Sequence, residues 1–497
     1  MDQLGQLEMF SVFVVLFAIF VVLGFYGARF RRGNLNDLGD WALAGRKLGS
    51  FLTFFLQGAD WFTAYSILAI PSSVFVSGAF GFFGVAYQTM VFAFAMIFVP
   101  TLWIRARERG YITASDFVKD RFRSTTLSIF LAVVGIVAVL PYMALQITGL
   151  QAVLTAMLYG TVGASHVEEI ALIIAFIILA AFTFTSGLRG ATLGAVMKDV
   201  LVWIALLSIV AVIVPSVGGF GHAFQSLPAK YSTINPSLSL AFSTSMLGVV
   251  ISAYLWPHNI NASLGASSAG RLKRGFALAP LYAVPLALAD LMGALVLKVP
   301  SALSFLTNFP TSYRGILVIP SLLITKFPPW FAGLALLGVF IGGLVPAAVM
   351  AIAQGNLLAR NIVKELRPST SEKGVTSIAK WASAAFKFLA LAFVFTVPAS
   401  YALQFYLVGA ILIIQLMPAV FLGLYSDWFK SQALIAGTAL SIAAGVYMVL
   451  SVNHFKQITT TLYPTPLGSI YIGVIALAIN LLVTVVVSAA IPRRKVA

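Results

Sequence analysis

The sequence contains no cysteine, and charged residues make up only 9% of its 497 positions. Without cysteine, the chain has no disulfide, no thiolate metal site and no thiol nucleophile. A soluble domain carries about a quarter charged residues, which is far more than this chain has for covering a water-exposed surface. The composition therefore excludes an ordinary soluble protein.

The sequence also lacks the motifs of common enzymes. It has only four histidines, none of them in the HExxH spacing of a zinc hydrolase. No GxxxxGK[ST] loop is present to hold ATP, and no GxSxG turn is present to carry a nucleophilic serine. We therefore expect neither an enzyme nor an ATP-driven pump.

Hydrophobic residues instead make up 60% of the chain and form runs of about twenty, each long enough to cross a bilayer as a helix. The sequence predicts an all-α polytopic membrane protein with about thirteen transmembrane helices, and hence a lipid bilayer around it. The predicted spans are 9–29, 49–70, 81–104, 125–158, 169–186, 191–217, 238–262, 275–298, 330–360, 379–398, 401–425, 431–453 and 468–491. The two longest loops, 218–238 and 299–330, have room for short helices.

The distribution of basic residues along the chain indicates the membrane topology. The net charge is +16, which in a soluble protein would suggest nucleic acid as a partner. Here most basic residues fall in loops that follow odd-numbered spans, so we expect no nucleic acid and a multi-pass protein of the cell membrane. The positive-inside rule places the N-terminus outside and the C-terminus in the cytoplasm. These basic residues are Arg29, Arg31, Arg32, Arg46, Lys47, Arg105, Arg107, Arg109, Lys119, Arg121, Arg123, Arg189, Lys198, Arg271, Lys273, Arg274, Arg360, Lys364, Arg367, Lys373, Lys380, Lys430, Arg493, Arg494 and Lys495.

The second predicted span contains a carboxylate, Asp60, among small and polar residues. A charge at membrane depth is costly and usually faces a cavity or a partner. Small residues around it favour an interrupted helix whose free backbone groups can coordinate a ligand. The alternative is a structural acid bonded to a neighbouring helix.

The seventh span contains a second predicted interruption, at Pro257. Proline removes a backbone donor and strains the preceding turn. The next residue, His258, is a solute ligand on one interpretation and a satisfied interfacial histidine on the other.

Span four carries Tyr142, Gln146 and Gly149 on one helical face. This stripe suits either a cavity wall or hydrogen bonding between helices. Asp290 and Lys387 are further charges inside spans, and they either couple transport or pair with each other.

The polar residues near the expected breaks form the predicted wall of a solute site. The predicted wall consists of Asp60, Thr63, Ser66, Gln88, Tyr142, Gln146, Tyr254, His258 and Asn356.

Several motifs in this order resemble the solute:sodium symporter family. They are Trp41–Arg46, which resembles the family's AGR motif, Pro71…Phe75…Gly78, the loop Ile112–Phe122, and Ser186–Gly190 followed by Lys198-Asp199. The stretches Pro141–Gln151 and Phe327–Ile362 are similar to the monocarboxylate-permease branch of that family.

The resemblance implies a LeuT-type fold with two inverted five-helix repeats (5+5) and peripheral helices. It divides the chain into a first span and cytoplasmic loop (1–48), a first repeat (49–217), a second repeat (218–425), and two C-terminal spans with a basic tail (426–497).

The resemblance also implies a sodium site made by backbone carbonyls of Ala59, Phe62 and Ala348. Two hydroxyl-bearing positions of the family are Ala351 and Ile352 here, which lack those oxygens. Sodium prefers oxygen ligands, so this departure makes a proton the alternative coupling ion, with Asp60 as its candidate carrier.

The sequence thus predicts an ion-coupled secondary transporter for a small organic solute, worked by alternating access. The solute is a monocarboxylate or an amino acid, the coupling ion is a proton or sodium, and no other cofactor is expected. The alternatives are a sodium-coupled symporter of sugars or other solutes, and a solute channel.

Overall fold

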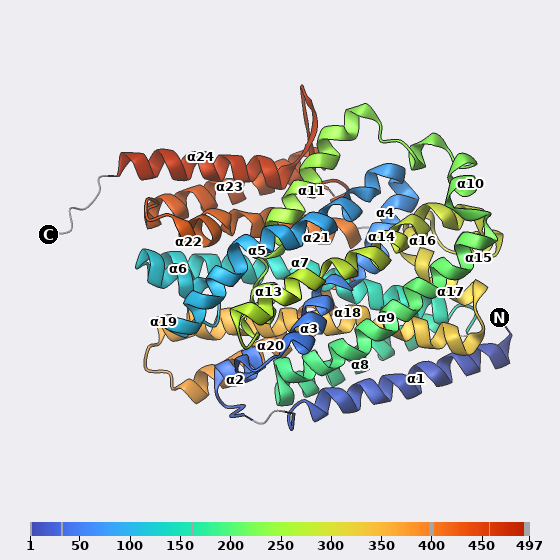
Figure 1. The fold of residues 1–497 in the computed structure, drawn as a ribbon, viewed down its shortest axis with the longest axis horizontal. Coiled ribbons are helices and arrows are strands. Elements are labelled where there is room, and N and C mark those ends of the chain that lie inside the picture. Colours follow the sequence, from blue (N-terminus) through green and yellow to red (C-terminus); the bar gives the residue numbers. More distant parts are fainter. Residues whose placement is uncertain (1, 31–32, 162, 397–401, 457, 492–497) are drawn as a thin grey trace.

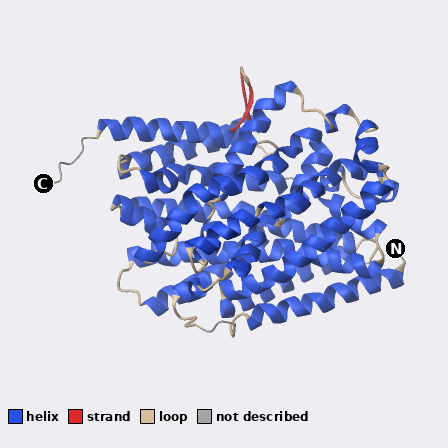
Figure 2. Ribbon diagram, viewed as in Figure 1, coloured by secondary structure: helices blue, strands red, loops and turns tan. Residues whose placement is uncertain are grey.

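The computed structural model describes the chain except for residues 1, 31–32, 162, 397–401, 457 and 492–497. The described chain is almost entirely helical, as predicted, with one short hairpin (Figure 2). Five residues used above for orientation, Arg31, Arg32, Arg493, Arg494 and Lys495, lie outside the described part. The predicted end of span ten at 398 and the predicted start of span eleven at 401 lie outside it as well.

The N-terminal half of the chain forms the first helices of the bundle (Figure 1). The elements are α1 (Gln3–Tyr26), α2 (Leu38–Leu43), η1 (Ala44–Arg46), α3 (Ser50–Trp61), η2 (Tyr65–Ala69), α4 (Ile70–Ser77), η3 (Gly78–Phe82), α5 (Phe83–Arg109), α6 (Ala114–Phe122), α7 (Thr125–Met157), α8 (Ala164–Ser186), α9 (Leu188–Ser216), α10 (Gly219–Gln225), η4 (Ala229–Tyr231) and η5 (Pro236–Leu238).

The C-terminal half completes the bundle. It contains α11 (Ser239–Ala253), α12 (Pro257–Leu264), α13 (Ala269–Leu278), α14 (Pro280–Leu295), η6 (Val296–Lys298), α15 (Pro300–Thr307), α16 (Thr311–Arg314), η7 (Gly315–Leu317), α17 (Val318–Lys326), α18 (Pro329–Asn356), η8 (Leu357–Val363), α19 (Lys364–Leu366), α20 (Glu372–Val394), α21 (Ala402–Ile413), η10 (Ile414–Leu416), η11 (Pro418–Leu422), α22 (Gly423–Tyr425), α23 (Ser431–Val452), β1 (Leu462–Thr465), β2 (Gly468–Tyr471) and α24 (Ile472–Ala490).

Twelve helical segments of the described chain are long and apolar enough to cross a membrane, one fewer than the thirteen spans predicted. The difference lies in the second span. Its first half, α3, has only 12 residues, and its second half continues into α5 as one segment, Tyr65–Arg109. The short helices expected in the two long loops are present as α10 and α15–α17.

Several predicted boundaries were wrong. Helix α1 begins at Gln3 and α20 at Glu372, both earlier than the hydropathy pattern predicted, because Asp2 and Ser371 cap them with side-chain oxygens. The predicted start of the last span at 468 belongs to β2, which pairs antiparallel with β1 before α24 begins.

Helix α18 forms the centre of the bundle. It contacts α1, α7, α9, α12 and α20, and every residue from Ala335 to Asn356 is buried. Peripheral helices show the opposite pattern: α1 exposes Val14, Val15 and Val22, and α8 exposes Ile170 and Ile177. A water-exposed helix would carry polar residues there, so these faces are suited to lipid.

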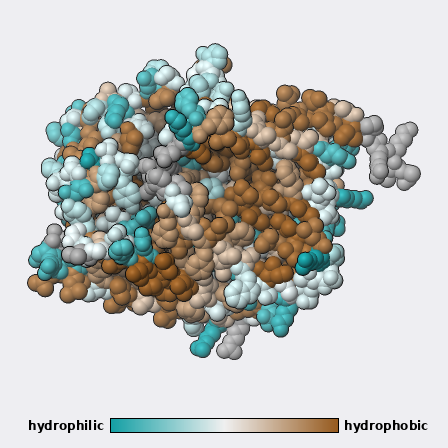
Figure 3. Space-filling view, turned by 180° about the vertical axis from the view of Figure 1, so that it is seen from behind, coloured by the Kyte–Doolittle hydropathy of each residue, from teal (hydrophilic) through white to brown (hydrophobic). Residues whose placement is uncertain are grey.

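The surface shows the same separation of lipid-suited apolar regions from hydrophilic regions. From behind, an extensive apolar area occupies the middle of the molecule and hydrophilic residues gather towards its ends (Figure 3). Helices α6 and α19 lie at one end of the bundle and α10 and α15 at the other (Figure 1). Helix α1 begins at the α10 end, whereas α24 finishes at the α6 end.

Two basic residues assigned above to loops are in fact buried in the helical bundle. Lys198 lies inside α9 with 0% exposure, and Arg189 lies in the first turn of α9 with 1% exposure. Arg189 pairs with Asp40 at 2.8 Å. The sequence prediction was wrong because hydropathy counts a charge as polar whether or not a partner inside the bundle neutralises it.

Candidate functional site

The first predicted interruption is confirmed. Helix α3 ends at Trp61, and Phe62 leaves the helical conformation with φ −84° and ψ 78°. The chain resumes as the π-helical turn η2. Small polar side chains replace the lost helical bonds: Ser66 Oγ accepts from the Thr63 amide at 3.1 Å. The break therefore follows from local sequence.

The second predicted interruption is also confirmed. Helix α11 ends at Ala253 and α12 begins at Pro257, with a turn between them. Asn259 Nδ2 donates to the carbonyl of Ala253 at 2.6 Å and so satisfies an oxygen that the break leaves free. Proline at the first helical position suits this restart, because that position has no hydrogen bond to lose.

The polar stripe of α7 faces the first break. Gln146 Oε1 accepts a hydrogen bond from the Ala64 amide at 3.0 Å. A Cβ placed on Gly149 would lie 2.4 Å from Ala64 Cβ, so the absent side chain allows the close approach of α7. These residues link α7 to the broken helix.

An aromatic cluster joins the two breaks. The Tyr65 and Tyr406 rings stack at 3.9 Å, and Tyr142 lies 4.8 Å from Tyr406, 5.0 Å from Trp256 and 5.6 Å from His258 between ring centroids. Sequence reasoning found Tyr142 and His258 but missed Tyr65, Tyr406 and Trp256. Their only signal was an aromatic residue beside each break, which is common in membrane helices.

Buried polar atoms without a hydrogen-bond partner accumulate near this cluster. Within the described chain they include Asp60 Oδ1, the Gln88 amide, the Tyr254 hydroxyl and both ring nitrogens of His258. A buried polar atom left unpaired costs about 1–3 kcal/mol. Such a concentration is therefore typical of a site that binds a polar ligand.

The remaining predicted wall residue lies elsewhere. Asn356 is the last residue of α18 and borders η8, which contacts α6, α7 and α20. No hydrogen bond within the described chain connects it to either break. The suggested pairing of Asp290 with Lys387 was wrong: Lys387 Nζ donates to Thr183 Oγ1 at 2.7 Å and to Ser383 Oγ at 3.1 Å.

The α3 break is occupied by a charged side chain that sequence reasoning missed. Lys198 Nζ, from α9, donates to the carbonyls of Gly58 at 3.1 Å and Phe62 at 3.0 Å. It also pairs with Asp199 Oδ1 at 2.9 Å, and Tyr282 donates to Asp199 Oδ2 at 2.8 Å. Two hydrogen bonds thus hold the ammonium at the break, and the Asp199 carboxylate supplies an opposite charge beside it.

These contacts decide whether the expected sodium site fits this chain. Ala59, Phe62 and Ala348 are all buried, but the Phe62 carbonyl already accepts from Lys198. Helix α18 faces the break with Gly342, whose added Cβ would lie 3.7 Å from the Phe62 carbonyl oxygen and which carries no side-chain oxygen. Ala351 and Ile352 lie about 14 Å further along the same helix and do not border the break. Sodium is a hard cation that needs several oxygen ligands, so the residues at this position do not fit it.

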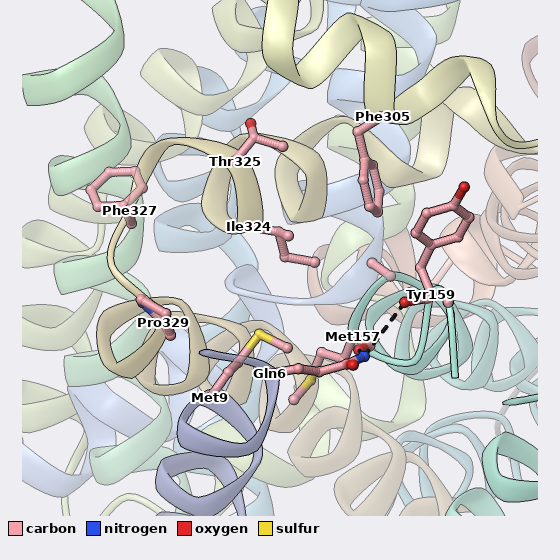
Figure 4. Close-up of a pocket in the computed structure, with 11 residues that line it drawn as sticks. Gln6, Met9, Met157, Tyr159, Phe305, Ile324, Thr325, Phe327 and Pro329 are labelled. Carbon is pink, nitrogen blue, oxygen red and sulfur yellow. Dashed lines mark hydrogen bonds between the residues drawn. The ribbon is translucent and has the colours of Figure 1, made fainter. Parts of the chain in front are cut away.

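A large cavity lies away from both breaks. It has a volume of about 600 Å³ and opens between the first turns of α1, the end of α7 and the α17–α18 turn (Figure 4). Gln6 crosses its floor to the Met157 carbonyl at 2.9 Å. None of its lining residues belongs to a broken helix, so we do not place the solute there.

Charged and polar side chains connect helix α6 to η8 and α19, which follow α18. Asp116 accepts from Arg360 Nε at 2.7 Å and from Asn361 Nδ2 at 2.8 Å. Lys119 pairs with Glu365 at 2.6 Å. These bonds close the bundle at the end where the basic loops gather.

Two broken helices packed around a central helix, with unpaired polar groups between them, define a class of membrane transporter, the LeuT-like fold. A solved sodium-coupled sialic acid symporter, in a substrate-bound outward-open state, matches this arrangement with a TM-score of 0.76 at 15% identity. The match covers 98% of this chain and 99% of the other.

The Sodium:solute symporter family model matches residues 41–440, and this chain belongs to that family. It is 34% identical to a monocarboxylate transport permease protein of Rhizobium johnstonii, over 97% of both chains. It is 28% identical to the uncharacterized symporter YodF of Bacillus subtilis, over 97% of this chain and 94% of the relative. The chain is therefore a multi-pass secondary active symporter rather than an enzyme.

Proposed function

We propose that this symporter moves a small monocarboxylate, with an amino acid as the second candidate solute. The observation that carries the proposal is the group of unpaired polar atoms between the two breaks, above all the ring nitrogens of His258. The similar permease of Rhizobium johnstonii, which shares 34% of its residues, supports a carboxylate in particular.

The α12 half-helix supplies a second reason for a carboxylate. Its first turn contains His258 and Asn259, whose backbone amides lack helical partners, and the positive end of the helix dipole lies there. An anion is stabilised at such a position. In our proposal His258 and Tyr142 orient the carboxylate, and Asp60, Thr63, Ser66, Gln88, Gln146 and Tyr254 complete the wall.

The bounds of the two repeats, the membrane orientation and the coupling ion belong to the same proposal. The first repeat spans 49–217 and the second 218–425, with the N-terminus outside and the C-terminus in the cytoplasm of the cell. The coupling ion is a proton or sodium.

Uptake into proteoliposomes tests the proposal. Purified protein should accumulate labelled lactate with saturable kinetics when a proton or sodium gradient is applied, and unlabelled monocarboxylates should compete. Alanine competing better than lactate would favour the amino-acid alternative, and glucose competing best would favour a sugar symporter. Linear, non-saturable entry that never exceeds the outside concentration would indicate a channel and contradict the proposal.

A further inference from the structure

The cation position at the α3 break is filled by part of the protein itself. Lys198 Nζ lies 3.1 Å from the Gly58 carbonyl and 3.0 Å from the Phe62 carbonyl. The break frees the Phe62 carbonyl, because the Ser66 amide that would bond to it in a regular helix turns to Thr63 Oγ1 instead. The end of a helix also carries partial negative charge, which stabilises a cation.

We propose that the ammonium of Lys198 is a tethered cation that replaces a coupling sodium ion at this break, so that transport by this chain does not require sodium. The inference rests on the proposed symport function and names the ion requirement of the same site. Both cations are monovalent, and both are held by backbone carbonyls of the broken helix.

The groups around Lys198 hold its side chain in a defined position. The side chain is fully buried, and Asp199 and Tyr282 form a chain of contacts behind it. A Cβ on Gly58 would lie 2.1 Å from the Tyr282 ring and 2.3 Å from Asp199 Oδ2, so only glycine lets these groups approach the break. The network therefore depends on a specific backbone position as well as on charge.

Charged and polar groups from three helices surround the Lys198 ammonium. Asp60 faces it from α3, Asp199 from α9, and the Tyr282 hydroxyl reaches Asp199 from α14. Helix α18 faces the break with Gly342, whose added Cβ would lie 3.7 Å from the Phe62 carbonyl oxygen, and glycine offers no hydroxyl to an ion there. A sodium ion on the Phe62 carbonyl would sit beside a second positive charge, and the two would repel each other.

Sodium-induced stabilisation of the purified protein tests the proposal without any solute. We expect the unfolding temperature of the wild-type protein to be the same in sodium chloride and in choline chloride of equal ionic strength. A rise of about 2 °C or more in sodium would overturn the proposal, because it would show a sodium site on the native protein.

A designed variant should respond to sodium in the opposite way to the wild-type protein. Lys198→Thr combined with Gly342→Ser removes the ammonium and adds two hydroxyls, because an added Cβ on Gly342 would lie 3.7 Å from the Phe62 carbonyl oxygen. This variant should gain a stabilisation by sodium of about 2 °C or more. A monodisperse variant that shows no gain would overturn the assignment of these carbonyls as a cation position. Lys387→Thr, at the second buried lysine, is the matched control and should gain nothing.

Uptake separates this inference from the proposed function. Lactate uptake by wild-type proteoliposomes should change by less than about twofold when choline replaces sodium at constant pH, and a fall of about tenfold would overturn the inference. Absence of lactate uptake in both media would contradict the proposed solute. The stabilisation measurements would still decide the role of Lys198. If the double variant does not fold, the two wild-type measurements suffice.

Discussion

Gln146 Oε1 accepts a hydrogen bond from the backbone amide of Ala64 at 3.0 Å, and this bond links α7 to the broken helix. Both groups are buried, so no solvent can replace the acceptor. We expect Gln146→Leu to lower the free energy of unfolding by about 1–3 kcal/mol, because the Ala64 amide is left unpaired. Thermal unfolding in detergent measures the effect. Gln225→Ala, at an exposed position of α10, is the control and should change nothing. Equal stability of Gln146→Leu and the wild type would contradict this account.

Gly58 permits the approach of Tyr282 and Asp199 to the α3 break. We expect Gly58→Ala to abolish most uptake, because its Cβ would lie 2.1 Å from the Tyr282 ring and must displace it. The matched control is Gly49→Ala at the start of the same helix, where an added Cβ meets no atom within 4 Å. Uptake by both variants in proteoliposomes, corrected for the amount of protein, measures the difference. Similar activity of the two variants would refute the requirement.

A substitution at His258 should weaken ligand binding with little effect on stability. Its ring nitrogens have no partner within the described chain, so His258→Phe breaks no hydrogen bond of the protein. We expect the affinity for a monocarboxylate to fall by about tenfold or more, since a hydrogen bond to a charged group contributes about 1.5–3 kcal/mol. The unfolding temperature should fall little. Isothermal titration with lactate gives the affinity, and exposed His222→Phe is the control. Unchanged affinity would remove His258 from the site.

The charged contacts of Asp116 predict a barrier at the α6 end of the bundle. Asp116→Asn weakens the pairing with Arg360 and disturbs the bond to Asn361. Ala353 lines a small internal space behind Thr113, and the cysteine-free chain makes Ala353→Cys a unique label site. We expect maleimide to react roughly tenfold faster with Ala353→Cys when Asp116→Asn is present. Glu372→Gln, at an exposed pair with Lys364, is the control. No acceleration would show that these bonds do not hold that end closed.

Topology gives a direct test of the charge argument. Ser304 in α15 and Lys373 in α20 are exposed at opposite ends of the bundle. The positive-inside rule predicts that an impermeant maleimide labels Ser304→Cys in intact cells and labels Lys373→Cys only after lysis. The reverse pattern would invert the proposed orientation.

The sequence by itself determined the class of protein and the places where its helices break. Long apolar runs leave a bilayer as the only suitable solvent, and Pro257 and the small residues around Asp60 disrupt helices through local backbone chemistry. Interactions between residues adjacent in sequence were enough for these features, so they were predictable. The length of α3 was not, because the pattern stays apolar across the break.

Tertiary structure alone decided what fills the first break. Lys198 is 140 residues from Gly58 in sequence, and only the packing of α9 against α3 brings its ammonium to the carbonyls at the break. From hydropathy the same lysine was counted as a loop charge. A charge is tolerated inside a membrane protein only where distant groups satisfy it. Whether they do depends on how the helices pack, which neither composition nor spacing specifies.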